Sequence, residues 1–457
     1  MSNHLSRRGF LAGSSAITAM ATGALRPDTA SASPGLVAVP ETNWKPFMDQ
    51  YYDGAVAIIE GIRDTQVGAI AEAMRTAYDL QKKGGTVYSD IVFGHYASLA
   101  QGKNRPGQPW VLPQFDILDP EEVFDAIKPG DFLITHVTSE ARKRAKERGV
   151  FVAGVTSNYY PFYKTPAGGL REDKMALPTC EEMSNMVIDS QVPWDNGLVT
   201  APQVPQFKLC PSTGIGALAV YWACTALFAT LIGSKGKDTS TAPATDYLDT
   251  LLERFRLVRT DRPKIAAVTS KWADMVLANK PTFMVWGEQF KVSEGRTGNP
   301  YVSDAVGSAS GSMLGQHYNE DKLTDNDMVL LCSMRSRQED EIAVAQAARR
   351  KGAYVAALCP YETDGDASGM RLFKEVDDAF NTYGGDSEGV LNVKGFDNKI
   401  CPTAGLSGLL VHWMLMASWT DHMAQRGEMP YYWQGYHETG GSDYDTAVRP
   451  FFFKRGY

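Results

Sequence analysis

Two ionisable side chains stand where a predicted strand gives way to a turn beside a glycine. His95 follows Gly94, and Glu288 follows Gly287 in the second half of the chain. Side chains at such strand ends face the ligand in many α/β proteins. Two unlike ionisable groups at equivalent positions can act as an acid and a base, so we predict His95 and Glu288 as catalytic candidates. The alternatives are a structural role for His95 and a solvated loop cap for Glu288.

Small hydroxyl residues stand where strands or loops lead into predicted helices. They are Ser212, Thr213, Ser333, Ser336 and Thr403. The first amides of a helix have no partner within the helix, and the helix dipole favours negative charge there. Hydroxyl groups at these places add hydrogen-bond donors without charge repulsion. We therefore predict these residues as ligand-binding candidates.

A repeated segment contains two of these turns. Residues 208–222 (KLCPSTGIGALAVYW) reappear 191 positions later as residues 399–413 (KICPTAGLSGLLVHW), and seven of the fifteen residues are identical. A gap-free match of this length indicates a duplicated unit. Ser212 and Thr403 occupy the same place in the two copies, before an apolar stretch that is typical of a helix. The ligand site is therefore expected where two copies of one domain meet.

Strands and helices alternate in the first copy. The predicted elements are a helix over 58–80, strands over 86–93, 132–137 and 150–156, and a basic helix over 139–148. Short connections between alternating strands and helices predict a parallel, doubly wound sheet.

The second copy repeats that plan. Its predicted elements are helices over 265–277 and 338–351 and strands over 282–286, 327–333 and 353–359. The residue pairs that correspond are Asp131 and Asp327, Gly149 and Gly352, and Asp195 and Asp386. The predicted fold class is therefore α/β, with two doubly wound parallel-sheet domains that form a pseudo-dimer.

The N-terminus has the features of an export signal. The pair Arg7-Arg8 stands before a mild apolar run that extends to Leu25, and residues 30–32 (ASA) form a small-residue cleavage site. This is the pattern of a twin-arginine signal, so we expect a periplasmic or secreted protein that begins near residue 33. The alternative is a chance arginine pair near a loose N-terminus.

The chain is acidic, with a formal net charge of −8. That charge argues against nucleic acid and anionic membranes as partners. Residues 215–232 are uncharged and long enough to span a membrane, but the equivalent stretch 406–419 contains His412 and Ser418. A helix buried on all sides explains both copies, so we expect no membrane span after the signal. Self-association through the apolar helices or the aromatic C-terminal tail is left open.

The sequence contains no familiar cofactor or metal motif. HExxH, GxSxG, Walker and clustered Cys/His patterns are absent. The six cysteines form no CxxC pair, and most have apolar neighbours, which is typical of buried small residues. We therefore predict neither a cofactor nor a metal.

These features together resemble a SIS (sugar isomerase) domain in both halves, over most of residues 55–425. The shared pattern is a helix, a strand and a Gly-His turn, followed by Pro-Gly-Asp, an apolar strand, a hydroxyl-rich turn, a helix and another apolar strand. The resemblance is to SIS-type families of uncharacterised sugar isomerases. It implies a flavodoxin-like fold. It also implies a phosphosugar at the carboxyl ends of the strands, with its phosphate in a Ser/Thr-rich turn at a helix N-terminus.

The chain departs from that family pattern at its turns. Residues 93–95 (FGH) lack one glycine of the first turn. The first phosphate turn, residues 135–139 (THVTS), has no glycine and contains His136, which becomes a further ligand-binding candidate. The second, residues 333–337 (SMRSR), keeps both serines and adds two arginines, so it is the better anion site. An uncharged sugar or a sugar acid therefore stands beside a sugar phosphate as the expected ligand.

We accordingly predict an exported, sugar isomerase-like protein that binds a carbohydrate derivative at the pseudo-dimer cleft and has the groups for aldose–ketose isomerisation. The alternative is a non-catalytic carbohydrate- or anion-binding protein of the same fold, and the sequence leaves enzyme activity open. The predicted segments are a signal peptide (1–32), a lead-in (33–54), a first domain (55–232), a linker (233–257), a second domain (258–425) and an aromatic tail (426–457).

Overall fold

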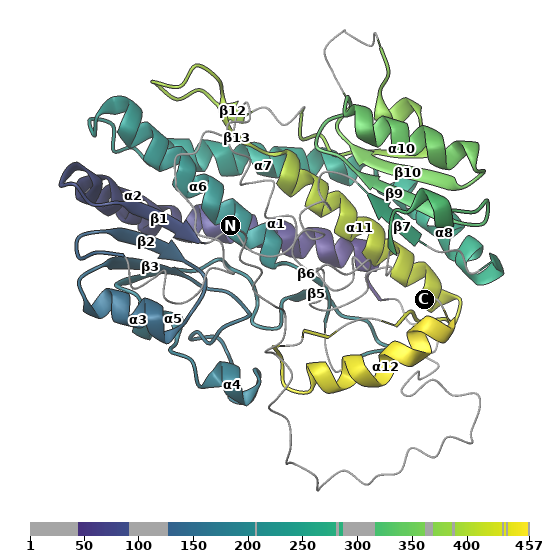
Figure 1. Cartoon of the computed structure of the whole chain (residues 1–457), viewed down its shortest axis with the longest axis horizontal. Helices are drawn as coiled ribbons and strands as arrows, with labels where there is room; N and C mark the ends of the chain where they lie inside the picture. The colour runs from purple at the N-terminus through teal and green to yellow at the C-terminus, as the bar shows by residue number, and fades with distance from the viewer. Residues whose placement is uncertain are drawn as a thin grey trace, which may run out of the picture. The chain divides into compact units, whose positions relative to one another are not determined.

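The computed structural model of the chain describes residues 44–90, 127–205, 208–279, 283–286, 316–361, 369–385, 389–431, 434–435 and 437–455 (Figure 1). The first half contains α1 (Phe47–Thr65), α2 (Val67–Lys82), β1 (Val87–Asp90), β2 (Phe132–Thr135), α3 (Glu140–Glu147), β3 (Phe151–Val155), α4 (Glu172–Met175), α5 (Cys180–Met183), β4 (Met186–Ile188), β5 (Gly197–Val199), β6 (Leu209–Pro211) and α6 (Thr213–Ser234). The second half contains α7 (Ala242–Thr260), α8 (Arg262–Asn279), β7 (Phe283–Trp286), β8 (Gln316–His317), η4 (Glu320–Lys322), β9 (Met328–Cys332), α10 (Glu339–Arg350), β10 (Tyr354–Cys359), η5 (Leu372–Lys374), β11 (Asp378–Asn381), β12 (Gly389–Leu391), β13 (Ile400–Pro402), α11 (Ala404–Gln425) and α12 (Gly441–Arg455).

Each half contains a parallel sheet. The first sheet has the strand order β1-β2-β3-β4 and the second has β11-β10-β9-β7-β8, and every strand pair in both is parallel. The second order is the 2-1-3-4-5 order of flavodoxin-like folds. The first sheet follows the same order over the strands that the structure describes, without a counterpart of β8. The predicted α/β fold with two parallel sheets is confirmed.

Helices cover both faces of each sheet because the strands are apolar on both sides. In the first sheet, Leu133 and Val152 share a buried cluster with Ala141 and Ala145 of α3, while Phe132 belongs to the main core, and α2 packs against β1 and β2. In the second sheet, α10 contacts β9 and β10, and α11 also contacts β10. Strands buried on both faces read as continuous apolar runs, which is why the sequence indicated them.

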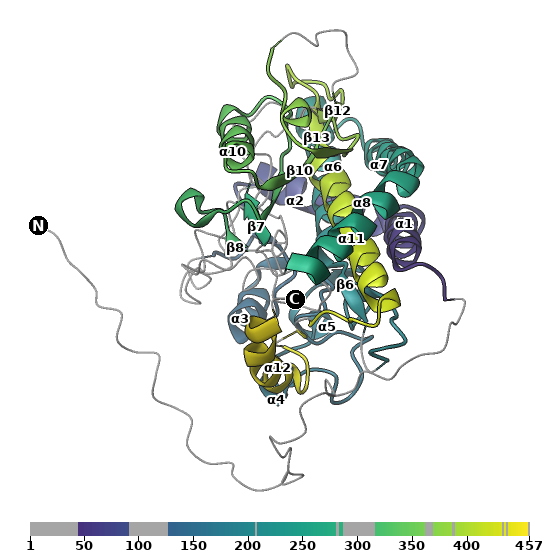
Figure 2. The same cartoon turned by 90° about the vertical axis from the view of Figure 1, so that its right-hand side faces the viewer.

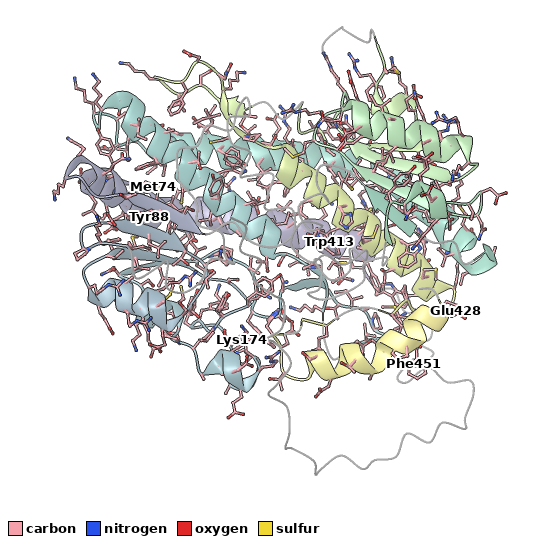
Figure 3. All side chains as sticks on the ribbon, in the orientation of Figure 1. Met74, Tyr88, Lys174, Trp413, Glu428 and Phe451 are labelled. Atoms are coloured by element: carbon pink, nitrogen blue, oxygen red, sulfur yellow. The ribbon has the colours of Figure 1, made fainter. Side chains whose placement is uncertain are left out.

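The long apolar helices α6 and α11 form the centre of the core. Nearly every residue of both is buried, as a helix that is apolar on all sides requires. α6 packs against α2 and α7, whereas α11 packs against α1 and α8 (Figure 2). Trp413 marks the buried stretch of α11 (Figure 3). Among the described helices, α6 is long and apolar enough to cross a membrane, but 94% of its most apolar 18-residue stretch is buried within the protein.

Helices α1 and α7 make the same contact in the two halves. The hydroxyl of Tyr51 in α1 donates to the carbonyl of Pro211 at 3.1 Å, and Tyr247 in α7 donates to the carbonyl of Pro402 at 3.1 Å. Both tyrosines are fully buried, and burial raises the pKa of each well above its ordinary value. Each helix thereby fixes the short strand that leads into α6 or α11.

The two halves also share an unfavourable backbone conformation. Cys210 and Cys401, each just before the proline that accepts the tyrosine bond, have φ values of 61° and 60°. Gln191 and Tyr383 form a second matched pair, with φ values of 61° and 54°. A non-glycine residue in this region costs about 1–3 kcal/mol, so surrounding contacts must hold it. Matched strain of this kind supports the duplication.

All six cysteines are buried and none forms a disulfide. Burial raises the pKa of Cys180 to about 12, and it raises the pKa of Cys210 and Cys224 further. A thiol with a raised pKa is a weak nucleophile. These cysteines therefore act as small core residues, as their apolar neighbours in the sequence indicated.

Two helix boundaries differ from the sequence-based prediction. Residues 58–80 are not one helix but parts of α1 and α2, which break at Gln66. The predicted linker 233–257 connects the halves only over residues 235–241, because α7 begins at Ala242. Beyond that point, buried apolar residues recur at helical spacing, and their packing outweighs the polar composition of the segment before them.

Both ends of the described chain are more regular than predicted. α1 begins at Phe47, within the predicted lead-in 33–54. The predicted tail 426–457 contains helix α12, which carries Phe451 (Figure 3). The predicted signal peptide lies outside the described residues.

The matched tyrosine bonds give a test of the duplicated core. We expect Tyr51→Phe and Tyr247→Phe each to lower the free energy of unfolding by about 1–2 kcal/mol, since each leaves a buried carbonyl without its donor. The double variant should lose about the sum, because the two sites are separate. Urea unfolding of the four proteins measures this. A loss in only one single variant would contradict equivalent roles for α1 and α7.

Candidate functional site

The carboxyl ends of the first sheet's strands gather buried polar side chains. Because the strands are parallel, these ends meet along one edge. The residues are Ser89, Thr135, His136, Thr138, Thr156, Ser157, Asn158, Asp189 and Ser190, each less than one-tenth exposed. Burying polar groups is costly unless they are hydrogen-bonded. A hydrogen-bond network is therefore needed to hold this edge.

Asp189, directly after β4, is the charged centre of that network. Its Oδ2 accepts hydrogen bonds from the Tyr163 hydroxyl at 2.5 Å and from Lys164 Nζ at 2.7 Å, and its Oδ1 accepts one from Thr156 at 3.1 Å. Burial opposes the ionisation of Asp189, but the bonds from Lys164 and Tyr163 outweigh it and lower the pKa of this carboxyl. Burial likewise opposes the charge of Lys164, and Asp189 reverses the effect, so that the pKa of the lysine is raised.

Tyr163 and Lys164 reach solvent, whereas Asp189 does not. Tyr163 is 62% exposed, and the side chains of Lys164 and Asp189 are 37% and 10% exposed. Lys164 Nζ also lies 5.3 Å from the centre of the Tyr163 ring. The cluster therefore presents an ammonium group and a phenol to a ligand, and a buried carboxylate positions both.

The start of α6 adjoins the same edge. The side-chain oxygen of Asn196 accepts hydrogen bonds from the amides of Ser212 and Thr213, at 2.9 and 2.8 Å. The Ser212 hydroxyl donates to the Asn196 carbonyl at 2.8 Å. A Cβ on Gly216 would lie 2.5 Å from the Ser190 carbonyl, so the first turn of α6 packs directly on the residues after β4. Ser212 and Thr213 thus lie beside the strand ends, where Asn196 binds their amides.

A residue of the C-terminal segment completes this junction. His437 is fully buried, and its Nε2 lies 3.0 Å from Asn158 Nδ2. Thr213 Oγ1 lies 2.6 Å from Asn196 Oδ1 and within hydrogen-bond distance of Asn158 Oδ1. One hydroxyl hydrogen cannot serve both acceptors. With its amide turned by 180°, Asn158 donates to Thr213 and accepts from His437, and every contact is satisfied.

Backbone contacts hold that C-terminal segment on the first half. The Arg171 amide donates to the His437 carbonyl at 3.0 Å, and Leu170 and Glu438 form an antiparallel bridge. The Tyr159 ring meets the His437 ring edge-on, with 4.5 Å between their centres. The imidazole is therefore fixed in place from two sides.

Two of these positions carry different side chains in the second sheet. Asn381 takes the place of Asp189, and its side-chain oxygen accepts the Tyr383 amide at 2.9 Å. Ala404 takes the place of Thr213 at the start of the long helix. Within the described residues, the carboxylate and the helix-start hydroxyl network therefore belong to the first half.

Ser333 was predicted to bind an anion in the second half. Its hydroxyl accepts the Arg335 amide at 3.1 Å and donates to the Arg335 carbonyl. Thr135 makes the same pair of bonds with Val137, at 3.0 and 3.2 Å. Both hydroxyls thus close the turn that follows their own strand.

Of the other predicted residues, some lie near the carboxyl edge of one of the two sheets, and two lie outside the described residues. Ser336 and His136 are buried in the turns before α10 and α3. Thr403, at the start of α11, donates to a backbone carbonyl after β11 at 3.3 Å. His95 and Glu288 lie outside the described residues. The structure therefore brings Ser212, Thr213 and His136 to the edge that holds Asp189.

Several residues of this site were not among the sequence-based candidates, including Asp189, Lys164 and His437. Asp189 directly follows an apolar strand, which is a usable signal. Lys164 comes from a loop and His437 from the tail, and no local pattern predicts which strand ends these segments reach.

A scan against protein-family models and a search of curated proteins give no match. Among solved structures, the chain is similar to a protein of Salmonella typhimurium described as sugar binding, with 11% identity, a TM-score of 0.44, and coverage of 81% of this chain and 98% of that one. It is similar to the C-terminal domain of glucosamine-fructose-6-phosphate aminotransferase from Francisella tularensis, with 11% identity, a TM-score of 0.41, and coverage of 85% of this chain and 98% of that one. It is also similar to tagatose-6-phosphate ketose/aldose isomerase from Escherichia coli, with 10% identity, a TM-score of 0.40, and coverage of 84% of this chain and 96% of that one.

The charge on Asp189 gives a pH-dependent prediction. Because its pKa is lowered in the folded state, its contribution to stability is complete above the ordinary aspartate pKa and is lost as pH falls through the folded pKa. We expect Asp189→Asn to cost about 1–2 kcal/mol at neutral pH and less near about pH 3, which lies below the ordinary aspartate pKa. Urea unfolding at both pH values measures this.

Asn381→Ser is the matched control at the uncharged position of the second sheet. Its cost should be the same at both pH values. A pH-independent cost for Asp189→Asn would contradict a folded-state ion pair.

Proposed function

We propose that this protein binds a carbohydrate derivative at the carboxyl edge of its first sheet. The observation that supports this most is the cluster of Asp189, Lys164 and Tyr163. A buried carboxylate holds an ammonium and a phenol at the surface. The ammonium keeps N–H donors for sugar hydroxyls, a carboxylate or a phosphate, and the phenol oxygen, whose hydrogen goes to Asp189, can accept from a sugar hydroxyl. The resemblance of the sequence to SIS domains favours the same edge.

The network beneath the cluster supports a binding role. Thr156 joins Asp189 to Ser190, and Asn158 joins the α6 start to His437. A site whose donors are fixed before the ligand arrives loses less entropy on binding. The buried hydrogen bonds therefore serve to preorganise the exposed groups.

One site per chain follows from the asymmetry between the halves. The second sheet has Asn381 where the first has Asp189, and Ala404 where the first has Thr213. The proposal therefore includes a stoichiometry of one ligand per chain, although the fold contains two copies of the domain.

The ligand class can be found with a thermal-shift screen of sugars, sugar acids and sugar phosphates. A ligand present at 100 times its dissociation constant adds about 2.7 kcal/mol of stability. Titration calorimetry with the best ligand should then give one site per chain. Lys164→Met should weaken binding by about tenfold or more, because a hydrogen bond from a charged group is lost.

The second half offers a matched control. Lys271 lies 4.4 Å from the Tyr354 ring centre and 3.7 Å from Asp378, so it belongs to a similar lysine–tyrosine–aspartate cluster, but at the amino ends of β10 and β11. Lys271→Met should leave affinity unchanged. The proposed site would be contradicted if Lys164→Met bound the ligand as tightly as the parent, or if Lys164→Met and Lys271→Met lost affinity equally.

Aldose–ketose isomerisation is a second candidate function for the same edge. The reaction needs a base that moves a proton between adjacent carbons and an acid that opens the ring. Tyr163 and Lys164 can donate protons and Asp189 can accept one, while His95 and Glu288 remain the acid–base pair that the sequence suggests. Proton NMR of the screened ligand in heavy water reads out exchange at the carbon beside the carbonyl. Binding without exchange would leave the non-catalytic alternative.

We also propose export by the twin-arginine route. The support is the Arg7-Arg8 pair with the small-residue site at residues 30–32. Replacing both arginines with lysine should leave the precursor in the cytoplasm on cell fractionation, because the signal depends on the arginine pair. Arg26→Lys, in the same segment, is the control and should be exported. Continued export of the double variant would contradict the assignment.

A further inference from the structure

A cavity of about 650 Å³ lies away from the strand ends, among four helices. It is lined by the start of α1, by the junction of α7 and α8, and by the C-terminal half of α11. Its volume is within the range of small-molecule sites. No residue of the Asp189 cluster lines it.

The carboxylate in this cavity is already fully engaged. Asp421 is buried, and its Oδ2 accepts the Phe47 amide at 3.0 Å. Its Oδ1 accepts hydrogen bonds from Trp44 Nε1 at 3.1 Å and from Gln425 Nε2 at 3.0 Å. Asp421 therefore links the start of α1 to α11, and both of its carboxylate oxygens accept hydrogen bonds from the protein itself.

The two arginines that line the cavity, Arg259 and Arg262, have N–H groups that other side chains do not use. Arg262 pairs with Asp49 through Nη2, and its Nε is screened from solvent but has no partner among the described residues. Arg259 lies over the Tyr52 ring, 5.0 Å from its centre. A guanidinium group has five N–H donors, so both leave donors for an anion. The cavity thus combines an engaged carboxylate with two partly engaged cations.

His422 supplies an acceptor in the same lining. Burial lowers its pKa, so the ring is neutral at neutral pH, and it hydrogen-bonds to the Ala266 backbone. A neutral imidazole that donates through one nitrogen accepts through the other. Met48, Ala266 and Pro263 contribute apolar surface.

We propose that this cavity is a second binding site, for a small organic carboxylate. Its carboxylate group would pair with Arg259 and Arg262, and its apolar body would lie against Met48 and Ala266. The two guanidinium groups in the lining and the largely apolar walls support an organic anion over an uncharged sugar. The site is independent of the proposed carbohydrate site.

Titration calorimetry of the whole chain with benzoate and hexanoate tests the charge requirement. Both should bind at millimolar concentration or below, while benzamide, which has the shape of benzoate without its charge, should bind at least about tenfold more weakly. Failure of both carboxylates to bind at about 10 mM, or equal binding of benzamide, overturns the proposal.

Two variants on α7 locate the bound carboxylate. Arg259→Gln should weaken benzoate binding by about tenfold, because it removes a charge-assisted hydrogen bond. Arg256, one turn earlier, lines a neighbouring groove of about 330 Å³, which Arg259 also lines, but it does not line the cavity. Arg256→Gln changes the same charge, so the affinity of this variant should stay within about twofold of the parent. Equal losses in the two variants would place benzoate in that groove and overturn the assignment. Circular dichroism confirms that both variants fold.

Discussion

Burial of α6 and α11 is the constraint on which the rest of the structure depends. Each is a helix of 22 residues, nearly all of which are buried, so it must be covered all round. The helices of one half cover only part of each long helix. In the first half, α1 and α2 contact α6, and α7 of the second half covers another side of it. In the second half, α7 and α8 contact α11, and α1 of the first half covers another side of it. A single copy of the domain would expose an apolar strip. The copies consequently form one compact unit over residues 38–457.

This packing also determines where chemistry can occur. α6 begins against the residues that follow β4, because Gly216 allows the helix to approach the Ser190 carbonyl. Tyr51 fixes the strand just before that helix from the side of α1. The helix start and the strand ends therefore meet at one edge, and Thr213 and Asn158 come within hydrogen-bond distance. The polar network of the candidate site is thus positioned by the apolar core beneath it.

Local sequence patterns predicted the parts of the fold that depend on local physics. Strands buried on both faces appear as apolar runs with turn-forming residues before them, so the predicted ranges for β3, β9 and β10 fall within about two residues of the observed ones. α7 was missed because the polar segment before it obscured the helical spacing of its buried residues, which begins at Ala244. The site was harder to predict, because Lys164 and His437 reach it through loops whose course depends on tertiary contacts. Ser333 was a plausible ligand residue by position, but its hydroxyl is used to close its own turn.

The two halves kept the same structural groups and diverged in their chemical ones. Tyr51 and Tyr247 make the same bond, and Cys210 and Cys401 hold the same strained backbone, because both long helices must be anchored in the same way. The polar edge is under no such requirement, and in the part of the chain that the structure describes the cluster of Asp189, Lys164 and Tyr163 has no equivalent at the carboxyl edge of the second sheet. His437 adds a further asymmetry: it comes from beyond the second half, yet it completes the network of the first. That network therefore cannot close until almost the whole chain has been synthesised, so the two halves are joined in forming the site as well as in burying the core.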